Sequence, residues 1–241
     1  NPIYDWKAHE KSGFAWWRAR LKSALETYDV VRIDHFRGIS AYYEIPYGAA
    51  DARGGKWCEG PGKKLFEGLP EEGFIAEDLG TIDEGVINLL QTTGFPGMKV
   101  LLFAFDGNPD NPFLLKNIPE NSVCYTGTHD NDTVRGYVEK LSAEEYILFR
   151  SRLASELAQA EIVMNLGKGY EKISEAFVRL ALASRAKLAV VSLQDVLDLN
   201  NEARMNFPGT DEGNWEFRLK TQPSAGSLRK LKNAIKKYGR R

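Results

Sequence analysis

The sequence has little cysteine and no long apolar run. Its only cysteines, Cys58 and Cys124, are isolated and form no C-x-x-C pair, which favours reduced thiols over a disulfide framework. The longest apolar segments, such as residues 100–105 and 188–193, have the length of a β-strand and are far too short to span a membrane. We therefore expect a soluble protein in a cytosol-like compartment, with no membrane partner.

An excess of charge of either sign is also missing. The chain has 33 acidic and 32 basic residues, so it offers no basic field to attract nucleic acid and no acidic tail. With 241 residues, 43% of them hydrophobic, it can bury a sizeable core. We expect an uncharged small molecule or polymer as the partner, and no nucleic acid.

The amino terminus has none of the features of a secretion signal. Residues 1–6 (NPIYDW) contain neither a charged segment nor an apolar one and are typical of the inside of a loop. We expect the chain to start partway through a gene product.

Short β-branched runs alternate with longer helical patterns, which predicts β/α units around a parallel sheet. The five expected strands are residues 30–34, 73–78, 98–103, 123–128 and 187–193. Capping boxes predict helices that begin after Thr81 and after Ser142, the first ending at Gly94 and the second near Asn165. Residues 170–184 and the basic amphipathic stretch 227–237 are expected to be helical, the latter as a solvated surface element, and residues 200–218 form a loop.

The first strand carries an arginine and an aspartate on one face. Because strand side chains alternate, Arg32 and Asp34 share one face while Val31 and Ile33 share the other. An arginine there would lower the pKa of Asp34 and keep it ionised, as a nucleophilic carboxylate requires. A pair that only ties strands together explains the motif nearly as well.

The second strand ends in two acids, Glu77 and Asp78. Asp78 is explained by the helix start that follows, where negative charge is favoured. Glu77 shares a face with Ile75, and partial desolvation there would raise its pKa towards that of a general acid. One ionised and one protonated carboxyl on neighbouring strand ends form the pair that retaining glycoside chemistry uses.

The third strand end gathers His129, Asp130 and Asp132. A metal site is one interpretation, but the three histidines of the chain lack ligand spacing, so we predict no metal. Asp132 with Thr133 can cap a helix. His129 and Asp130 remain as candidates to bind sugar hydroxyls as an oxocarbenium-like transition state forms.

These motifs together resemble a known family. Residues 32–38 (RIDHFRG), 75–80 (IAEDLG) and 126–132 (TGTHDND) resemble signature regions of the 4-α-glucanotransferases, which are called amylomaltases in bacteria and disproportionating enzymes in plants. Further similar segments are 94–100 (GFPGMKV), 194–197 (QDVL), 201–206 (NEARMN), 208–210 (PGT) and 213–215 (GNW).

The resemblance implies an α/β fold, a (β/α)8 barrel of the α-amylase clan, and a retaining transfer of 1,4-α-glucan segments. It places Asp34 as nucleophile, Glu77 as acid/base and Asp130 as transition-state stabiliser, without a cofactor. The implied partners are maltooligosaccharides and glucans derived from starch or glycogen, with glucose as an acceptor. The candidate substrate contacts are Arg32, His35, Trp57, His129 and Asn131, and Phe36, Tyr42, Tyr43 and Trp215 are further aromatic residues available either to sugar rings or to the core.

Members of this family are about twice as long as this chain. We therefore expect residues 1–241 to be the C-terminal part of the catalytic barrel domain, covering about strands four to eight, with the N-terminal half of the same protein as the missing partner. Since open sheet edges would remain, we predict that the isolated chain is inactive. Bacterial relatives would be cytoplasmic and plant relatives plastidic.

Three other functions compete with this interpretation. A hydrolase or phosphorylase of the same clan would present the same acids, although residues 201–215 and 35–38 favour the transferase. A silent glucan-binding module or regulatory fragment is a second alternative, against which the three intact acids argue. A nucleotide-binding sheet would need a glycine-rich phosphate motif, and the sequence has none.

Overall fold

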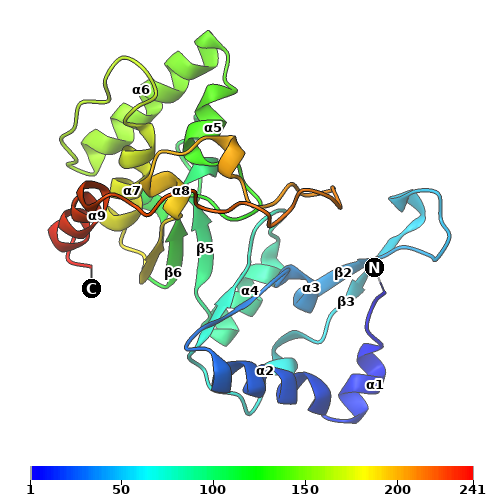
Figure 1. The fold of residues 1–241 in the computed structure, drawn as a ribbon. Helices are drawn as coiled ribbons and strands as arrows, with labels where there is room; N and C mark the ends of the chain where they lie inside the picture. Colours follow the sequence, from blue (N-terminus) through cyan, green and yellow to red (C-terminus); the bar gives the residue numbers. More distant parts are fainter. Residues whose placement is uncertain (1, 241) are drawn as a thin grey trace. The chain divides into compact units, whose positions relative to one another are not determined.

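A computed structural model describes residues 2–240 of the chain. The chain divides into two compact units, unit 1 up to Met98 and unit 2 from Lys99 onward. In both units, parallel strands alternate with helices along the sequence (Figure 1). The alternation expected from the sequence is therefore present, and each unit is described by itself below.

The sheet of unit 1 has the strand order β1-β4-β5. β1 (Val31–Ile33) runs parallel to β4 (Phe74–Ala76) with Ile33 opposite Ala76, and β4 runs parallel to β5 (Gly97–Val100). Asp34 and Glu77 are the next residues after that first pair, so they leave neighbouring strands at the same edge. The other elements are α1 (Trp6–Lys11), α2 (Ala15–Thr27), α3 (Arg37–Ser40), β2 (Ala41–Glu44), η1 (Ala52–Gly54), β3 (Lys56–Glu59), η2 (Gly62–Phe66) and α4 (Glu84–Thr93).

Phenylalanine rings form the core of unit 1. The ring of Phe36 is fully buried, with its centroid 6.1 Å from those of Phe66 and Phe95, and Phe74 lies 5.0 Å from Phe95. Phe36 is therefore a core residue and not a platform for sugar, which corrects the suggestion from the sequence. Its burial just after Asp34 anchors the end of β1 to the core.

In unit 2, β6 (Ser122–Tyr125) runs parallel to β7 (Leu188–Val190), and the strand order continues from β5 as β5-β6-β7. Figure 1 shows α7 and α9 side by side in this unit. The other elements are η3 (Leu101–Phe103), η4 (Leu115–Asn117), α5 (Val134–Glu139), α6 (Ala143–Gln159), α7 (Ile173–Ala183), α8 (Leu193–Val196), η5 (Asn201–Ala203) and α9 (Ala225–Lys237).

Several helix boundaries follow from local capping. The capping box at Ser142 is confirmed, since its hydroxyl accepts from the Glu145 amide while the Glu145 carboxylate accepts from the Ser142 amide. The box at Thr81 is wrong, because Asp83 caps α4 through the Val86 amide instead. Gly94 ends α4 in a left-handed conformation, as expected. The helix after Ser142 stops at Gln159, six residues before the predicted end.

All five expected strands are shorter than predicted, and two of them show why. The apolar run 98–103 leaves the sheet at Val100 and forms the 3-10 turn Leu101–Phe103, in which Leu101 and Leu102 are buried and Phe103 is exposed. The run 187–193 ends as a strand at Val190, because the Ser192 hydroxyl accepts from the Asp195 amide and begins α8. No helix within residues 2–240 is long and apolar enough to cross a membrane.

Candidate active site

Candidate residues lie in both units, and those of each unit are described by themselves. In unit 1, Arg32 and Asp34 lie on one face of the end of β1, as predicted. Nη2 of Arg32 is 2.7 Å from Oδ1 of Asp34, and the Asp34 side chain is 76% exposed. This carboxylate is oriented by one guanidinium and remains open to a ligand, which is the arrangement that a nucleophile needs.

Glu77 is fixed to the turn that follows Asp34. Its Oε2 accepts a hydrogen bond of 2.7 Å from the His35 amide, and its Oε1 accepts one of 3.0 Å from the Leu79 amide. The Glu77 amide in turn donates to the carbonyl oxygen of Ile33. The residue after Asp34 thus holds the carboxylate of Glu77, so the two candidate acids share a single rigid support.

His35 has a left-handed backbone, with φ of 46°, and it is not a glycine. Such a conformation costs free energy and persists where the surroundings impose it, often at functional sites. Its ring lies against Gly38, where an added Cβ would be 2.8 Å from Nδ1 of His35. Gly38 therefore leaves the room that the exposed imidazole of His35 occupies.

Asp78 has a different role from the one suggested by its place before a helix. It is buried, and its Oδ1 accepts a hydrogen bond of 2.6 Å from the Met98 amide, which ties β4 to β5. The helix begins six residues later, at Glu84. Asp78 thus joins β4 to β5 within the sheet. Because it directly follows Glu77 in the chain, this bond also fixes the position of the candidate acid/base.

Trp57 projects from the β2–β3 hairpin and is 56% exposed. The guanidinium of Arg37 lies 4.4 Å from its ring centroid, and the Tyr43 ring is 5.3 Å away, edge to face. Arg37 is itself held by Asp83, since both Nη atoms are 2.9 Å from Oδ2. Trp57 is therefore an exposed ring with a supported orientation, as a sugar platform would be.

In unit 2, the Asp130 carboxylate is engaged on both oxygens. Its Oδ1 accepts a hydrogen bond of 2.6 Å from Nδ2 of Asn206, and its Oδ2 lies 3.3 Å from Nε2 of His129. The His129 ring is 5.0 Å from the exposed ring of Trp215. His129, Asp130 and Trp215 thus form one cluster, and all three were among the candidates named from the sequence.

Asn131 is committed to its own loop through its side-chain oxygen, which accepts from both the amide and the hydroxyl of Thr128. Contact with a sugar would therefore have to come from its amide nitrogen. The helix start expected at Asp132 and Thr133 is confirmed for Thr133, whose hydroxyl accepts from the Gly136 amide at the start of α5. It is wrong for Asp132, whose carboxylate instead accepts from Lys140 and Arg204.

Sequence reasoning missed Arg204, which holds residues 126–132 in place. Its guanidinium donates to Oδ1 of Asp132 (2.5 Å), to the carbonyl oxygen of Asp130 (2.7 Å) and to the carbonyl oxygen of Asn206 (2.8 Å). The motif 201–206 was noticed, but nothing in its spacing shows that an arginine 74 residues from Asp130 contacts it.

Asp195 is a second group without a role in the sequence analysis. It is buried, and its carboxylate accepts from the Thr126 hydroxyl (2.6 Å) and from the Val134 amide (2.8 Å). Burial raises the pKa of Asp195, and these hydrogen bonds oppose the rise. It joins α5 and α8 to the start of the loop 126–132 that follows β6.

In the part of the chain that the structure describes, no cluster of three or more His, Cys, Asp or Glu residues could hold a metal ion.

Comparison with known proteins identifies the family of this chain. A sequence model described as 4-alpha-glucanotransferase matches residues 1–223. The chain belongs to the 4-alpha-glucanotransferase family. A 4-alpha-glucanotransferase of Aquifex aeolicus is 44% identical over 91% of this chain and 44% of its own length. A chloroplastic/amyloplastic 4-alpha-glucanotransferase of Solanum tuberosum is 41% identical over 100% of this chain and 41% of its own length.

The fold of this family member is shared with a solved structure. Amylomaltase from Streptococcus agalactiae, in complex with acarbose, matches all of this chain and 47% of its own, with a TM-score of 0.88 and 35% identity. The predicted fold class, an α/β chain forming part of a (β/α)8 barrel, is thereby confirmed. This chain spans less than half the length of these relatives.

Proposed function

We propose that the protein containing this chain is a 4-α-glucanotransferase, which moves a segment of a 1,4-α-glucan to the 4-hydroxyl of glucose or of another glucan. The observation that carries this proposal is the bond from the His35 amide to Glu77, next to the Arg32–Asp34 pair. It holds two carboxylates on adjacent strand ends, one available as nucleophile and one as acid/base, which is the pair of a retaining mechanism.

In the proposed reaction, a carboxylate oxygen of Asp34 attacks the anomeric carbon while Glu77 protonates the departing glucan oxygen. The product is a β-linked glucosyl ester of Asp34 and a shortened glucan. Glu77 then removes the proton of the incoming 4-hydroxyl, which displaces Asp34 and restores the α linkage. Asp130, oriented by Asn206 and His129, would stabilise the oxocarbenium-like transition state. This route uses carboxylates alone and needs no cofactor.

Substrate contacts follow from the exposed groups of each unit. We assign Arg32, His35 and Trp57 in unit 1 and His129 and Asn131 in unit 2 to sugar binding, with maltooligosaccharides and starch- or glycogen-derived glucans as substrates. We also propose that residues 1–241 are the C-terminal part of one catalytic barrel domain, and that the N-terminal half of the same protein completes it. The compartment would be the cytoplasm in a bacterium and the plastid in a plant.

The test uses maltotriose with the full-length protein and with Asp34→Asn, resolving products by chain length. Transfer gives glucans both longer and shorter than the substrate, and the ladder should be lost in the variant. Asp51→Asn is a matched control, since Asp51 is bonded to Arg53 in the same unit but lies outside the candidate site.

Each alternative predicts a different result in that assay. Glucose and maltose without longer products would make the protein a hydrolase. Glucan binding without turnover would make it a binding module. A ladder that persists in Asp34→Asn would remove Asp34 from the mechanism.

A further inference from the structure

Residues 208–210 and 213–215 belong to the motifs found in the sequence, and the proposed reaction gives them no role. Both lie in a segment of unit 2 that leads away from residue 205 and returns to it. The Trp215 amide donates a hydrogen bond of 2.6 Å to the carbonyl oxygen of Met205. Residues 205–215 therefore form a closed loop whose two ends are joined.

The side chain of Asn214 holds the interior of this loop. Its Oδ1 accepts a hydrogen bond of 2.7 Å from the Phe207 amide, and its Nδ2 donates one of 3.0 Å to the carbonyl oxygen of Thr210. The Thr210 hydroxyl donates to the carbonyl oxygen of Phe207 (2.8 Å). Because Asn214 directly precedes Trp215, these bonds fix the direction in which the Trp215 side chain leaves the loop.

Trp215 has a left-handed backbone, with φ of 63°. For a bulky residue this conformation costs free energy and persists only where the surrounding contacts impose it. The indole lies against the imidazole of His129, with the ring centroids 5.0 Å apart and the ring planes inclined by 37°. The loop thus maintains an unfavourable backbone conformation in the residue that contacts His129.

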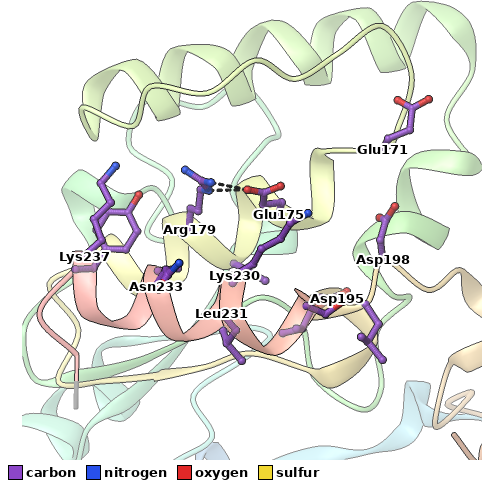
Figure 2. A pocket seen from close by; sticks show the side chains of 15 residues that line it. Glu171, Glu175, Arg179, Asp195, Asp198, Lys230, Leu231, Asn233 and Lys237 are labelled. Carbon is purple, nitrogen blue, oxygen red and sulfur yellow. Dashed lines mark hydrogen bonds and ion pairs between the residues drawn. The ribbon is translucent and has the colours of Figure 1, made fainter. Parts of the chain in front are cut away.

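The loop that carries His129 is held by Asp195 at its two ends rather than at this imidazole. Asp195, which Figure 2 shows in the lining of the pocket among α7, α8 and α9, accepts from the Thr126 hydroxyl and from the Val134 amide. Nε2 of His129 lies 3.3 Å from Oδ2 of Asp130, which is longer than a usual N–H···O hydrogen bond. One long contact orients an imidazole weakly, so the orientation of His129 depends on the ring packed against it.

We infer that Trp215 is a positioning residue for the pair His129 and Asp130. The inference rests on the proposed function, in which Asp130 stabilises the transition state and His129 contacts sugar. By packing against the imidazole, the indole keeps Nε2 directed at the Asp130 carboxylate before substrate enters. Preorganised groups of this kind act in the transition state, so their loss lowers kcat more than it raises KM.

The first test measures the contact itself, by nuclear magnetic resonance of the full-length protein labelled at its histidine rings. Loss of one signal in His129→Gln assigns the resonances of His129. Since the ring current of an indole shifts the protons of an adjacent ring, we expect the His129 ring protons to shift in Trp215→Ala. They should stay in place in Ile147→Ala, which removes an exposed apolar side chain of α6 in the same unit. Unmoved His129 protons in Trp215→Ala would overturn the inference.

The second test measures kcat and KM for transfer from maltotriose. We expect Trp215→Ala to lower kcat by about ten- to a hundredfold and to change KM by less than about twofold, since small misplacements of a catalytic group are costly. Trp215→Phe keeps an aromatic ring beside His129 and should recover most of the lost kcat. The control Ile147→Ala should match the unmodified protein.

The kinetic results separate this role from others. An unchanged kcat in Trp215→Ala would remove the positioning role, and a raised KM alone would make the indole a surface for sugar instead. An equal loss of kcat in Trp215→Phe and Trp215→Ala would overturn the role of the aromatic ring. If the unmodified protein showed no transfer from maltotriose, the proposed function would fail, whereas the resonance shift would still decide whether Trp215 orients His129.

Discussion

The amide of His35 donates a hydrogen bond of 2.7 Å to the carboxylate of Glu77, so the residue next to the proposed nucleophile holds the proposed acid/base. The two carboxylates have different roles in the mechanism, and a donor with a good leaving group separates them. Fluoride leaves without protonation, so the first step with an α-glucosyl fluoride needs Asp34 but not Glu77.

We therefore predict that Glu77→Gln loses at least about a hundredfold in transfer from maltotriose, a typical contribution of general acid–base catalysis. The same variant should keep the first turnover of the α-glucosyl fluoride, seen as a burst of about one fluoride per protein, whereas Asp34→Asn should lose both activities. A fluoride electrode and a chain-length assay measure the two. Equal loss of both activities in Glu77→Gln would contradict the assigned roles.

Gly97 offers a test of how β4 and β5 are joined. A Cβ at this position would lie 2.5 Å from Oδ2 of the buried Asp78, whose Oδ1 accepts from the Met98 amide. We expect Gly97→Ala to destabilise the protein by about 1–3 kcal/mol, the usual cost of overpacking a core, as measured by denaturant unfolding. Gly54→Ala is the control, since nothing lies within 4 Å of a Cβ there, and an equally stable Gly97→Ala protein would refute the argument.

The sequence predicted the arrangement of elements better than their ends. Parallel strands, the Ser142 cap and the Arg32–Asp34 contact could be read from alternation and short spacing, because these signals are local. The run 98–103 was mistaken for a strand throughout, since an apolar run has the same composition in a buried strand and in a buried 3-10 turn.

Contacts between distant residues could not be predicted. The bonds of Arg204 to Asp130 and of Asp195 to Thr126 join residues more than 60 positions apart, and no spacing rule encodes such a pair. The role of Phe36 could not be decided from the sequence either. An aromatic residue at this position fitted a sugar platform as well as a core, and only its full burial against the rings of Phe66 and Phe95 identifies it as core.

Arg204 should act as a positioning residue for Asp130. Arg204→Lys keeps the charge but loses the planar fork that reaches three acceptors at once. Since small misplacements of a catalytic group are costly, we expect kcat to fall by about ten- to a hundredfold, with KM for maltotriose changing little. Arg218→Lys is the control, because Arg218 donates only to the carbonyl oxygens of Trp215 and Phe217. A similar fall in both variants would contradict this role.

The outer strands predict the behaviour of the isolated chain. Among the described residues, β1 pairs only with β4 and β7 only with β6, so each leaves one edge without a partner. Unpaired edges favour association and leave a barrel open. We expect residues 1–241 alone to show no transfer from maltotriose under conditions in which the full-length protein is active. Transfer by the isolated chain that disappears with Asp34→Asn would show that the prediction is wrong.

Asp195 should make stability depend on pH. Burial raises its pKa above the ordinary value of 3.8, so in the window between that value and the raised one the folded state holds more protons than the unfolded state. The stabilising contribution of this group is therefore full below about pH 4 and decreases as the pH rises through the raised pKa.

Asp195→Asn cannot ionise. Its amide nitrogen can donate to the Thr126 hydroxyl, and its amide oxygen can accept from the Val134 amide. The unfolding midpoint of this variant, relative to the unmodified protein, should rise from pH 4 to pH 7, whereas the exposed Asp211→Asn should show no such trend. Parallel midpoints for all three proteins would mean that Asp195 does not titrate differently on folding.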